Sequence, residues 1–259
     1  SQAGAFLTRA DYLSPFFNET AYCMGVEKLL GVEIPDRARL IRILMMEINR
    51  LSSHWVWLAT GGMELGALTA MTNGFRARER CLDIFELITG LRMNHHYIRP
   101  GGVVQDLPAG TDEAIRQWIK EMREELRGID KLLTGQTIWV NRLKDVGWIG
   151  VEGCIALGIT GPILRAAGLP WDLRKTEPYL AYGMVDFDVP VYQAGDVYAR
   201  YRVHMDEMRQ SVRIVTQCLD RLEQMDGEPW IADDRKVVLP PRHELHTSME
   251  SLIHHFKIV

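Results

Sequence analysis

Apolar residues recur every three or four positions along most of the chain, the spacing that places them on one face of an α-helix. This pattern predicts long helices at about residues 16–30, 35–62, 73–89, 111–133 and 195–224, and a last helix at about 248–256. Segments rich in glycine and proline separate them, with short helices expected at about 151–157 and 161–167 and a strand or extended segment at 186–189. We therefore expect a mainly α fold with one helical core, irregular connections and little β-structure.

The segment 35–62 is apolar around most of its circumference in its first half, which predicts a buried central helix. Glu47, Arg50 and His54 follow at positions i, i+3 and i+7, so they form one polar line along it. A buried charge costs several kcal/mol unless it is partnered, so this line must meet other polar groups. The helix is expected to stop at its glycine pair. Glu64 follows in an apolar run and is expected either to be paired or to handle protons, the paired structural network being favoured.

Length, charge and cysteine spacing exclude several classes of protein. The 259 residues suffice for one large domain or two small ones, and a net charge of -4 gives no basic bias toward nucleic acid or anionic lipid. No apolar run is long enough to span a membrane, and no signal-peptide pattern is present. The four cysteines form no CxxC pair, so they are expected to be buried free thiols in a reducing compartment, with no metal held by this chain.

Seven motifs in fixed order are specific for one family: DYLSPFFNETAYCMGVEKLLG, EINRLSSHWVWL, ELGALTAM, YIRPGGVVQDLP, WDLRKTEPY, FDVPV and TSMESLIHHFK. Over essentially its whole length the chain resembles the 49 kDa-type D component of respiratory complex I, the NADH:quinone oxidoreductase. The resemblance implies a single helical domain over residues 1–259 with a core like that of the nickel–iron hydrogenase large subunit. It also implies a fragment that lacks the family's N-terminal HPSTHG loop and sheet and its C-terminal stretch.

The resemblance assigns a quinone site to two places in the chain. Tyr12, in the DYLS motif, matches the tyrosine that donates a hydrogen bond to a quinone carbonyl, and a neutral phenol can also release a proton to the reduced quinone. Read alone, a tyrosine before a Ser-Pro helix start would be structural. Glu64 stands where many relatives have an aspartate that pairs with a histidine of the HPSTHG loop, and Thr60 and Met63 would line the cavity beside it.

The resemblance places a second group of residues beside the terminal 4Fe-4S cluster of the neighbouring B subunit. Many relatives have a histidine at the position of Asn94, whose amide cannot titrate; whether His95 or His96 replaces it stays open. Arg99 is a candidate for stabilising this loop and the cluster's negative charge. Further along the chain, four charged residues are expected to form structural ion pairs: Arg165, Asp172, Arg174 and Lys175.

The family implies the quinone-site subunit of a proton-translocating NADH:quinone oxidoreductase, with quinone as substrate and with NADH and FMN bound elsewhere in the complex. Its partners would be the B, C and I subunits and the H membrane component, without nucleic acid, on the cytoplasmic face of a bacterial plasma membrane or the equivalent matrix side in mitochondria. The alternatives are a component of a hydrogenase-related membrane complex, against which the missing CxxC pairs weigh, and a non-enzymatic scaffold. Ubiquinone or menaquinone, the coupling mechanism and the accessory subunits stay open.

Overall fold

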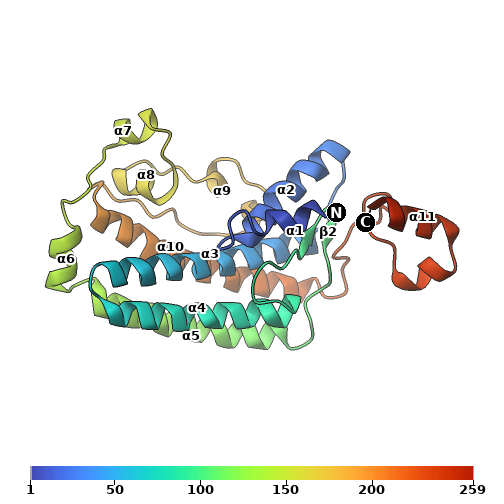
Figure 1. Cartoon of the computed structure of the whole chain (residues 1–259), viewed down its shortest axis with the longest axis horizontal. Coiled ribbons are helices and arrows are strands. Elements are labelled where there is room, and N and C mark those ends of the chain that lie inside the picture. The colour runs from blue at the N-terminus through green and yellow to red at the C-terminus, as the bar shows by residue number, and fades with distance from the viewer. Residues whose placement is uncertain (1, 259) are drawn as a thin grey trace.

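The computed structural model describes residues 2–258 and is mainly helical, as predicted (Figure 1). The long helices are α2 (Pro15–Leu30), α3 (Asp36–Glu64), α4 (Leu68–Thr89), α5 (Thr111–Leu133) and α10 (Val197–Gln224). The shorter ones are α1 (Ala3–Leu7), α6 (Thr137–Leu143), α7 (Val151–Ala156), α8 (Gly161–Ala167), α9 (Leu173–Thr176) and α11 (Met249–Ile258). Two 3-10 turns, η1 (Tyr182–Met184) and η2 (Arg242–His246), complete the helical elements.

The sheet in the described residues is a two-stranded antiparallel hairpin. Strand β1 (Ile98–Arg99) pairs with β2 (Gly102–Val103), with Ile98 opposite Val103 and Arg99 opposite Gly102. It lies between the helices predicted at 73–89 and 111–133, where the sequence analysis predicted only an irregular connection. The segment 186–189 is not part of a strand.

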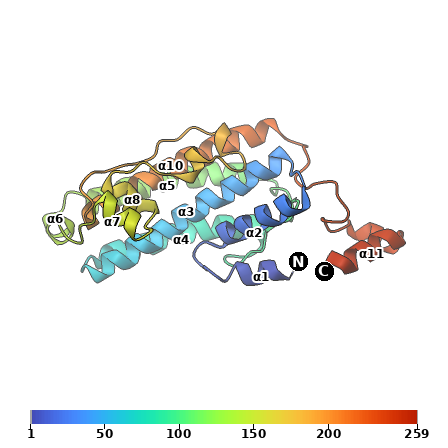
Figure 2. The ribbon, with the colours of Figure 1, turned by 90° about the horizontal axis from the view of Figure 1, so that it is seen from above.

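Helix α3 forms the centre of the molecule. It packs against α2, α4 and α10, and α5 closes the arrangement by contacting α4 and α10 (Figures 1 and 2). Its predicted apolar stripe is fully buried, including Leu40, Leu44, Ile48, Leu51 and Trp55. Burying one large apolar side chain contributes about 1.5–3 kcal/mol, so this stripe is a main source of stability.

Helices α3 and α4 approach so closely that their contact accepts only small residues. A Cβ atom added to Gly74 would lie 2.8 Å from the Cβ of Ala59 and 3.2 Å from the carbonyl oxygen of Trp55. At the same interface, a Cβ added to Gly62 would lie 2.9 Å from the Cβ of Ala70. Glycine is required at both positions because the partner is backbone or a short side chain.

Two predicted helix boundaries were wrong. Helix α3 continues through its glycine pair to Glu64, because packing of Gly62 against α4 outweighs the roughly 1 kcal/mol that glycine costs inside a helix. The following helix begins at Leu68 instead of residue 73, two residues after a left-handed Gly66. Helix α5 begins at Thr111, as predicted, after a left-handed Gly110.

The ends of three long helices and the state of the cysteines complete the fold. Gly31 and Gly90 end α2 and α4 in the left-handed conformation, and Asp196 caps α10 by accepting from the N–H of Ala199. All four cysteines are buried free thiols. Among residues 2–258, the helices are too short or too polar to cross a bilayer.

Candidate functional site

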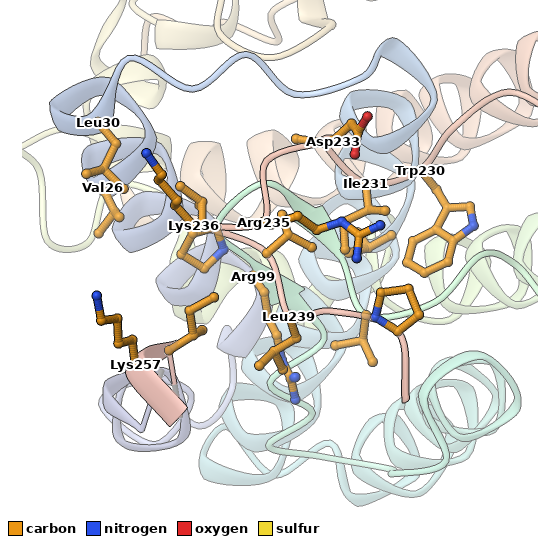
Figure 3. Close-up of a pocket in the computed structure, with 18 of the residues that line it drawn as sticks. Val26, Leu30, Arg99, Trp230, Ile231, Asp233, Arg235, Lys236, Leu239 and Lys257 are labelled. Atoms are coloured by element: carbon orange, nitrogen blue, oxygen red, sulfur yellow. The ribbon is translucent and has the colours of Figure 1, made fainter. Parts of the chain in front are cut away.

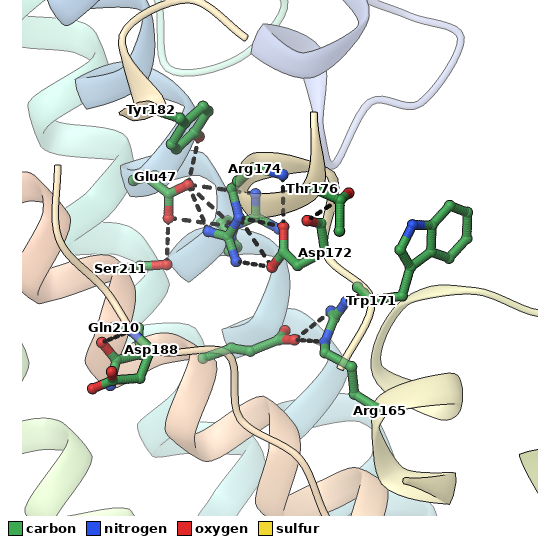
Figure 4. A network of polar contacts seen from close by, with 12 residues as sticks. Glu47, Arg165, Trp171, Asp172, Arg174, Thr176, Tyr182, Asp188, Gln210 and Ser211 are labelled. Carbon is green, nitrogen blue, oxygen red and sulfur yellow. Dashed lines mark hydrogen bonds and ion pairs between the residues drawn. The ribbon is translucent and has the colours of Figure 1, made fainter. Parts of the chain in front are cut away.

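Glu47, on the polar line of α3, lies at the centre of a buried network (Figure 4). Its carboxylate accepts hydrogen bonds from the hydroxyls of Tyr182 and Ser211, both at 2.6 Å, and from Arg174 at 3.0 Å. Arg50 lies 3.3 Å away on the next turn. Burial alone would raise the pKa of Glu47, but Arg50, Arg174 and the two hydroxyls lower it to about 2. The carboxylate therefore stays ionised, and the prediction that the polar line of α3 meets other polar groups is confirmed.

Most of the charged residues expected to form ion pairs extend this network. Asp172 caps α9, accepting from the N–H of Arg174 at 3.0 Å, and also pairs with the Arg174 guanidinium at 2.7 Å. Arg165 pairs with the buried Glu207. Lys175 differs: its ammonium lies 4.3 Å from the centre of the Phe187 ring. The prediction is confirmed for Arg165, Asp172 and Arg174, while Lys175 makes a cation–π contact.

His54, the last residue of the polar line, belongs to a second cluster between α3 and α10. Its Nε2 lies 2.8 Å from Oε2 of Glu207. The His204 ring stacks on Trp57 at 4.0 Å and meets the His54 ring edge-on at 4.5 Å. Burial, with a smaller effect of His54, lowers the pKa of His204 to about 3, so this imidazole is neutral at pH 7.

The loop that carries Tyr12 is fixed to the middle of α3. Asn49 donates from Nδ2 to the carbonyl of Leu13 at 2.8 Å and accepts the N–H of Phe16 at 3.3 Å. Asp11 accepts the N–H of Leu13 at 3.1 Å, which closes an Asx turn around Tyr12. The Tyr12 side chain is 62% exposed, so its hydroxyl is open to a ligand or a partner chain.

Thr60, Met63 and Glu64 lie in the last turn of α3. The Thr60 hydroxyl donates to the carbonyl of Val56 at 2.8 Å, and Met63 and Glu64 are exposed. Glu64 has no ion-pair partner within residues 2–258, so the expected pairing is not made inside the described chain. Glu64 is the one charged residue among those that line a cleft of about 230 Å³, whose walls include Trp57, Leu65, Trp139 and Tyr201.

Tyr12 and Glu64 are not brought together. The Tyr12 loop is attached at Asn49, fifteen residues before Glu64 on the same helix. At a rise of 1.5 Å per residue, these two attachment points are about 22 Å apart along α3. The structure therefore holds the two expected parts of the quinone site on one rigid helix but does not join them.

The segment that contains Asn94, His95 and His96 has two residues in the left-handed conformation, and His95 is buried while the other two are half-buried. Asn94 and His96 have φ angles of 57° and 48°, which are uncommon for residues other than glycine. The His95 ring stacks on Phe16 at 4.3 Å, and its Nε2 lies 3.1 Å from the carbonyl oxygen of Arg92. Burial lowers the pKa of His95 to about 4 and also lowers that of His96, where Arg99 acts in the same direction. Both imidazoles are therefore neutral at pH 7.

His96 and Arg99 line a cavity with a volume of about 700 Å³ (Figure 3). Residues of α2, the segment 230–241 and the last residues of α11 form further walls. Cations outnumber anions there: Arg235, Lys236 and Lys257 join Arg99, against Asp233 alone. The structure thus groups two of the four residues expected beside the cluster, while His95 is packed in the core.

Two buried acids, which sequence reasoning missed, hold this segment in place. Glu19 accepts the backbone N–H groups of Tyr97 at 3.0 Å and Ile98 at 2.8 Å through Oε2. Its Oε1 is buried without a hydrogen-bond partner among the described residues, and burial raises the pKa of Glu19 to about 7. Glu27 accepts the N–H of Gly101 at 2.9 Å. The sequence signal available was an acid on the apolar side of a helix.

Arg42 connects that hairpin to the central helix. Its guanidinium is fully buried, pairs with Glu27 at 2.6 Å and donates to the carbonyl oxygens of Arg99 and Gly102, both at 2.9 Å. A buried charge whose three guanidinium nitrogens all donate hydrogen bonds fixes its partners tightly. The hairpin is therefore positioned by α2 and α3 together.

Residues 64–259 match the family described as the 49 kDa subunit of respiratory-chain NADH dehydrogenase. The chain belongs to this family.

Relatives in several bacteria are more than half identical to the chain. The D component of the NADH-quinone oxidoreductase of Acidothermus cellulolyticus is 57% identical, over 100% of this chain and 62% of the relative. The D subunit of Frankia alni is 55% identical, over 100% of this chain and 58% of the relative. The D 1 subunit of Streptomyces avermitilis is 56% identical, over 100% of this chain and 62% of the relative. The chain spans about three fifths of the length of these relatives.

Proposed function

We propose that the chain is the quinone-site part of a proton-translocating NADH:quinone oxidoreductase. The observation that carries the proposal is the 57% identity, along the whole chain, with a relative named as the D component of an NADH-quinone oxidoreductase. In this proposal, the B, C and I subunits and the H membrane component surround the chain at the cytoplasmic face of the membrane, and NADH and FMN bind elsewhere. The chain itself supplies side chains for quinone binding and proton transfer.

Tyr12 is the proposed donor to a quinone carbonyl. Its exposed hydroxyl and the fixed Asx-turn loop support this role, because a donor must be held in place but remain accessible. Reduction of a quinone to a quinol adds two electrons and two protons. Electrons would come from the 4Fe-4S cluster of the B subunit. Tyr12 would deliver one proton to the basic oxygen of the reduced quinone and regain a proton from water, which would also supply the second proton.

Glu64 and its cleft form the second proposed part. Its position at the end of α3, beside an apolar cleft and without a partner in the described chain, supports a partner from another part of the complex. Thr60 and Met63 on the same turn would contact the quinone or that partner. Because about 22 Å of helix separates this end from the Tyr12 loop, both ends could be engaged only by an extended ligand or by a further polypeptide segment between them.

The segment with Asn94, His95, His96 and Arg99 is the proposed neighbour of the cluster. The neutral imidazoles of His95 and His96 support the view that neither replaces the titrating histidine found in many relatives at Asn94. Arg99 would then be the permanent positive charge of this segment, facing the cavity shown in Figure 3.

The substitution Tyr12→Phe in the assembled complex tests the proposal. It should lower quinone reductase activity by about tenfold or more, because one positioned donor is lost, while reduction of the clusters by NADH is unchanged.

Tyr192→Phe is the control, since the Tyr192 hydroxyl donates to Asp206 at 2.7 Å and the residue lines neither the cleft at Glu64 nor the cavity at Arg99. It should leave the activity unchanged. Activity of Tyr12→Phe within twofold of the parent at saturating quinone would show that Tyr12 is structural.

A further inference from the structure

We propose that His54, His204 and Glu207 form a binding site for a divalent transition-metal ion such as Zn²⁺, between α3 and α10. One ligand atom from each residue lies within 4.8 Å of the other two. His204 and Glu207 are three positions apart on α10, which places them on one face of that helix, and His54 reaches them from α3. Two imidazoles and one carboxylate are a typical zinc ligand set, with a fourth position left for water.

The ligand atoms need only a small movement to close on a metal. Bonds of about 2.0–2.1 Å in a tetrahedral arrangement put ligand atoms roughly 3.3 Å apart. The closest pair, His54 Nε2 and Glu207 Oε2, is already at 2.8 Å. To reach that spacing, this pair must widen by about 0.5 Å and the widest pair must contract by at most about 1.5 Å, movements that side-chain rotation can supply.

The surroundings of His204 favour the binding of a ligand. Its Nδ1 is buried and has no hydrogen-bond partner among the described residues, although an unsatisfied buried nitrogen is costly. Stacking on Trp57 fixes the orientation of the ring. The neutral form of imidazole is the one that binds metals, which agrees with the low pKa of His204.

A neighbouring side chain holds Glu207 in place by hydrogen bonds, as is common for metal-binding carboxylates. Arg165 donates from Nε to Oε1 at 2.8 Å and is itself fixed by the carbonyl oxygen of Trp171 at 3.0 Å, which leaves Oε2 directed at the histidines. The positive charge of Arg165 disfavours a dication, so we expect micromolar affinity instead of the tightest zinc binding. The sequence predicted no metal because only the spacing of the cysteines was considered. The ligands proposed here lie up to 153 positions apart and form no local zinc motif.

Zinc binding to the protein as isolated, after treatment with a chelator, tests the site directly. One Zn²⁺ per chain should bind, measured by metal analysis and by competition with a chromophoric chelator. In His204→Phe, which keeps an aromatic ring on Trp57 and removes no hydrogen bond, affinity should fall at least tenfold. Exposed histidines near the C-terminus could also bind zinc, so His246→Phe serves as the matched control and should retain the site.

Two further measurements complete the test. X-ray absorption of the zinc-loaded parent protein should show two imidazole nitrogens in the coordination sphere, and Co²⁺ should give tetrahedral ligand-field bands. Equal affinity and stoichiometry in the parent and a folded His204→Phe would overturn the proposal, as would a parent protein that binds no zinc. If circular dichroism shows that His204→Phe is unfolded, His204→Gln and the coordination sphere of the parent decide the question.

Discussion

At the scale of single residues, Glu19 and Glu47 show how the partners of a buried acid decide its charge. Both side chains are almost completely buried. Two arginines and two hydroxyls surround Glu47 and lower its pKa to about 2, whereas Glu19 accepts two backbone N–H groups, has one oxygen without a partner among the described residues, and has its pKa raised to about 7. The two residues should therefore affect stability in opposite directions as the pH changes.

Glu19→Gln should make the protein less sensitive to pH. Because the folded state raises the pKa of Glu19 from 4.5 to about 7, its favourable contribution is complete below pH 4.5 and is lost as the pH rises to about 7. The loss amounts to about 3 kcal/mol at 1.36 kcal/mol per pKa unit. Glutamine keeps an acceptor for Tyr97 and Ile98 without ionising, so urea denaturation should show a flatter stability profile and higher stability at pH 8.

Glu47→Gln is the matched comparison, because Glu47 and Glu19 change the stability in opposite directions as the pH rises. The lowered pKa of Glu47 gives stability that is present above pH 4.5 and is lost as the pH falls to about 2. Its replacement leaves Arg50 and Arg174 without this charged partner and should cost about 3–5 kcal/mol at pH 7. The interpretation fails if both variants shift the stability at pH 8 in the same direction.

The difference between these acids also marks how far the sequence predicts the site. Glu47 could be found because Arg50 and His54 follow it on the same face of an otherwise apolar helix. Glu19 offered only the weaker signal of a single acid on the apolar side of its helix, and the groups that contact it come from residues 97 and 98, nearly eighty positions later. Local spacing indicates that a polar group is buried, but its partners depend on how distant segments pack.

At the scale of elements, the α3–α4 contact explains the wrong boundary of the central helix. A pair of glycines in sequence is typical of a helix end. Here Gly62 allows the close approach of Ala70, and the packing of two long helices outweighs the weak helix propensity of glycine. Tertiary contacts of this kind are not visible in local sequence patterns.

Gly74→Ala should therefore destabilise the protein, although alanine favours helices. Its Cβ would lie 2.8 Å from that of Ala59, and relieving this overlap should cost about 1–3 kcal/mol. Gly128→Ala in α5 is the control, because no atom lies within 4 Å of the added Cβ, and it should gain about 0.5–1 kcal/mol. Urea denaturation of both variants measures the difference. A stabilising Gly74→Ala would show that the α3–α4 contact is looser than described.

At the scale of the whole molecule, the family and the mainly α fold could be predicted from ordered motifs and helical spacing. The arrangement of the site could not. Motif matching identifies Tyr12 and Glu64 but gives no distance between them, and their separation along α3 follows from where Asn49 fixes the Tyr12 loop. Glu64 has no ion-pair partner within residues 2–258. Its role therefore depends on groups outside the described residues, which the sequence pattern of this chain does not identify.

The buried network around Glu47 also has a consequence for biosynthesis. Arg174 and Ser211 follow Glu47 by 127 and 164 residues, so a ribosome adding about 5–20 residues per second needs roughly 10–30 s to supply both. Throughout that interval the apolar surface of α3 lacks the cover of α10, and the nascent chain should depend on holding chaperones. Chains stalled before residue 197 should be cleaved by protease within α3, while chains whose α10 has left the exit tunnel should resist cleavage there.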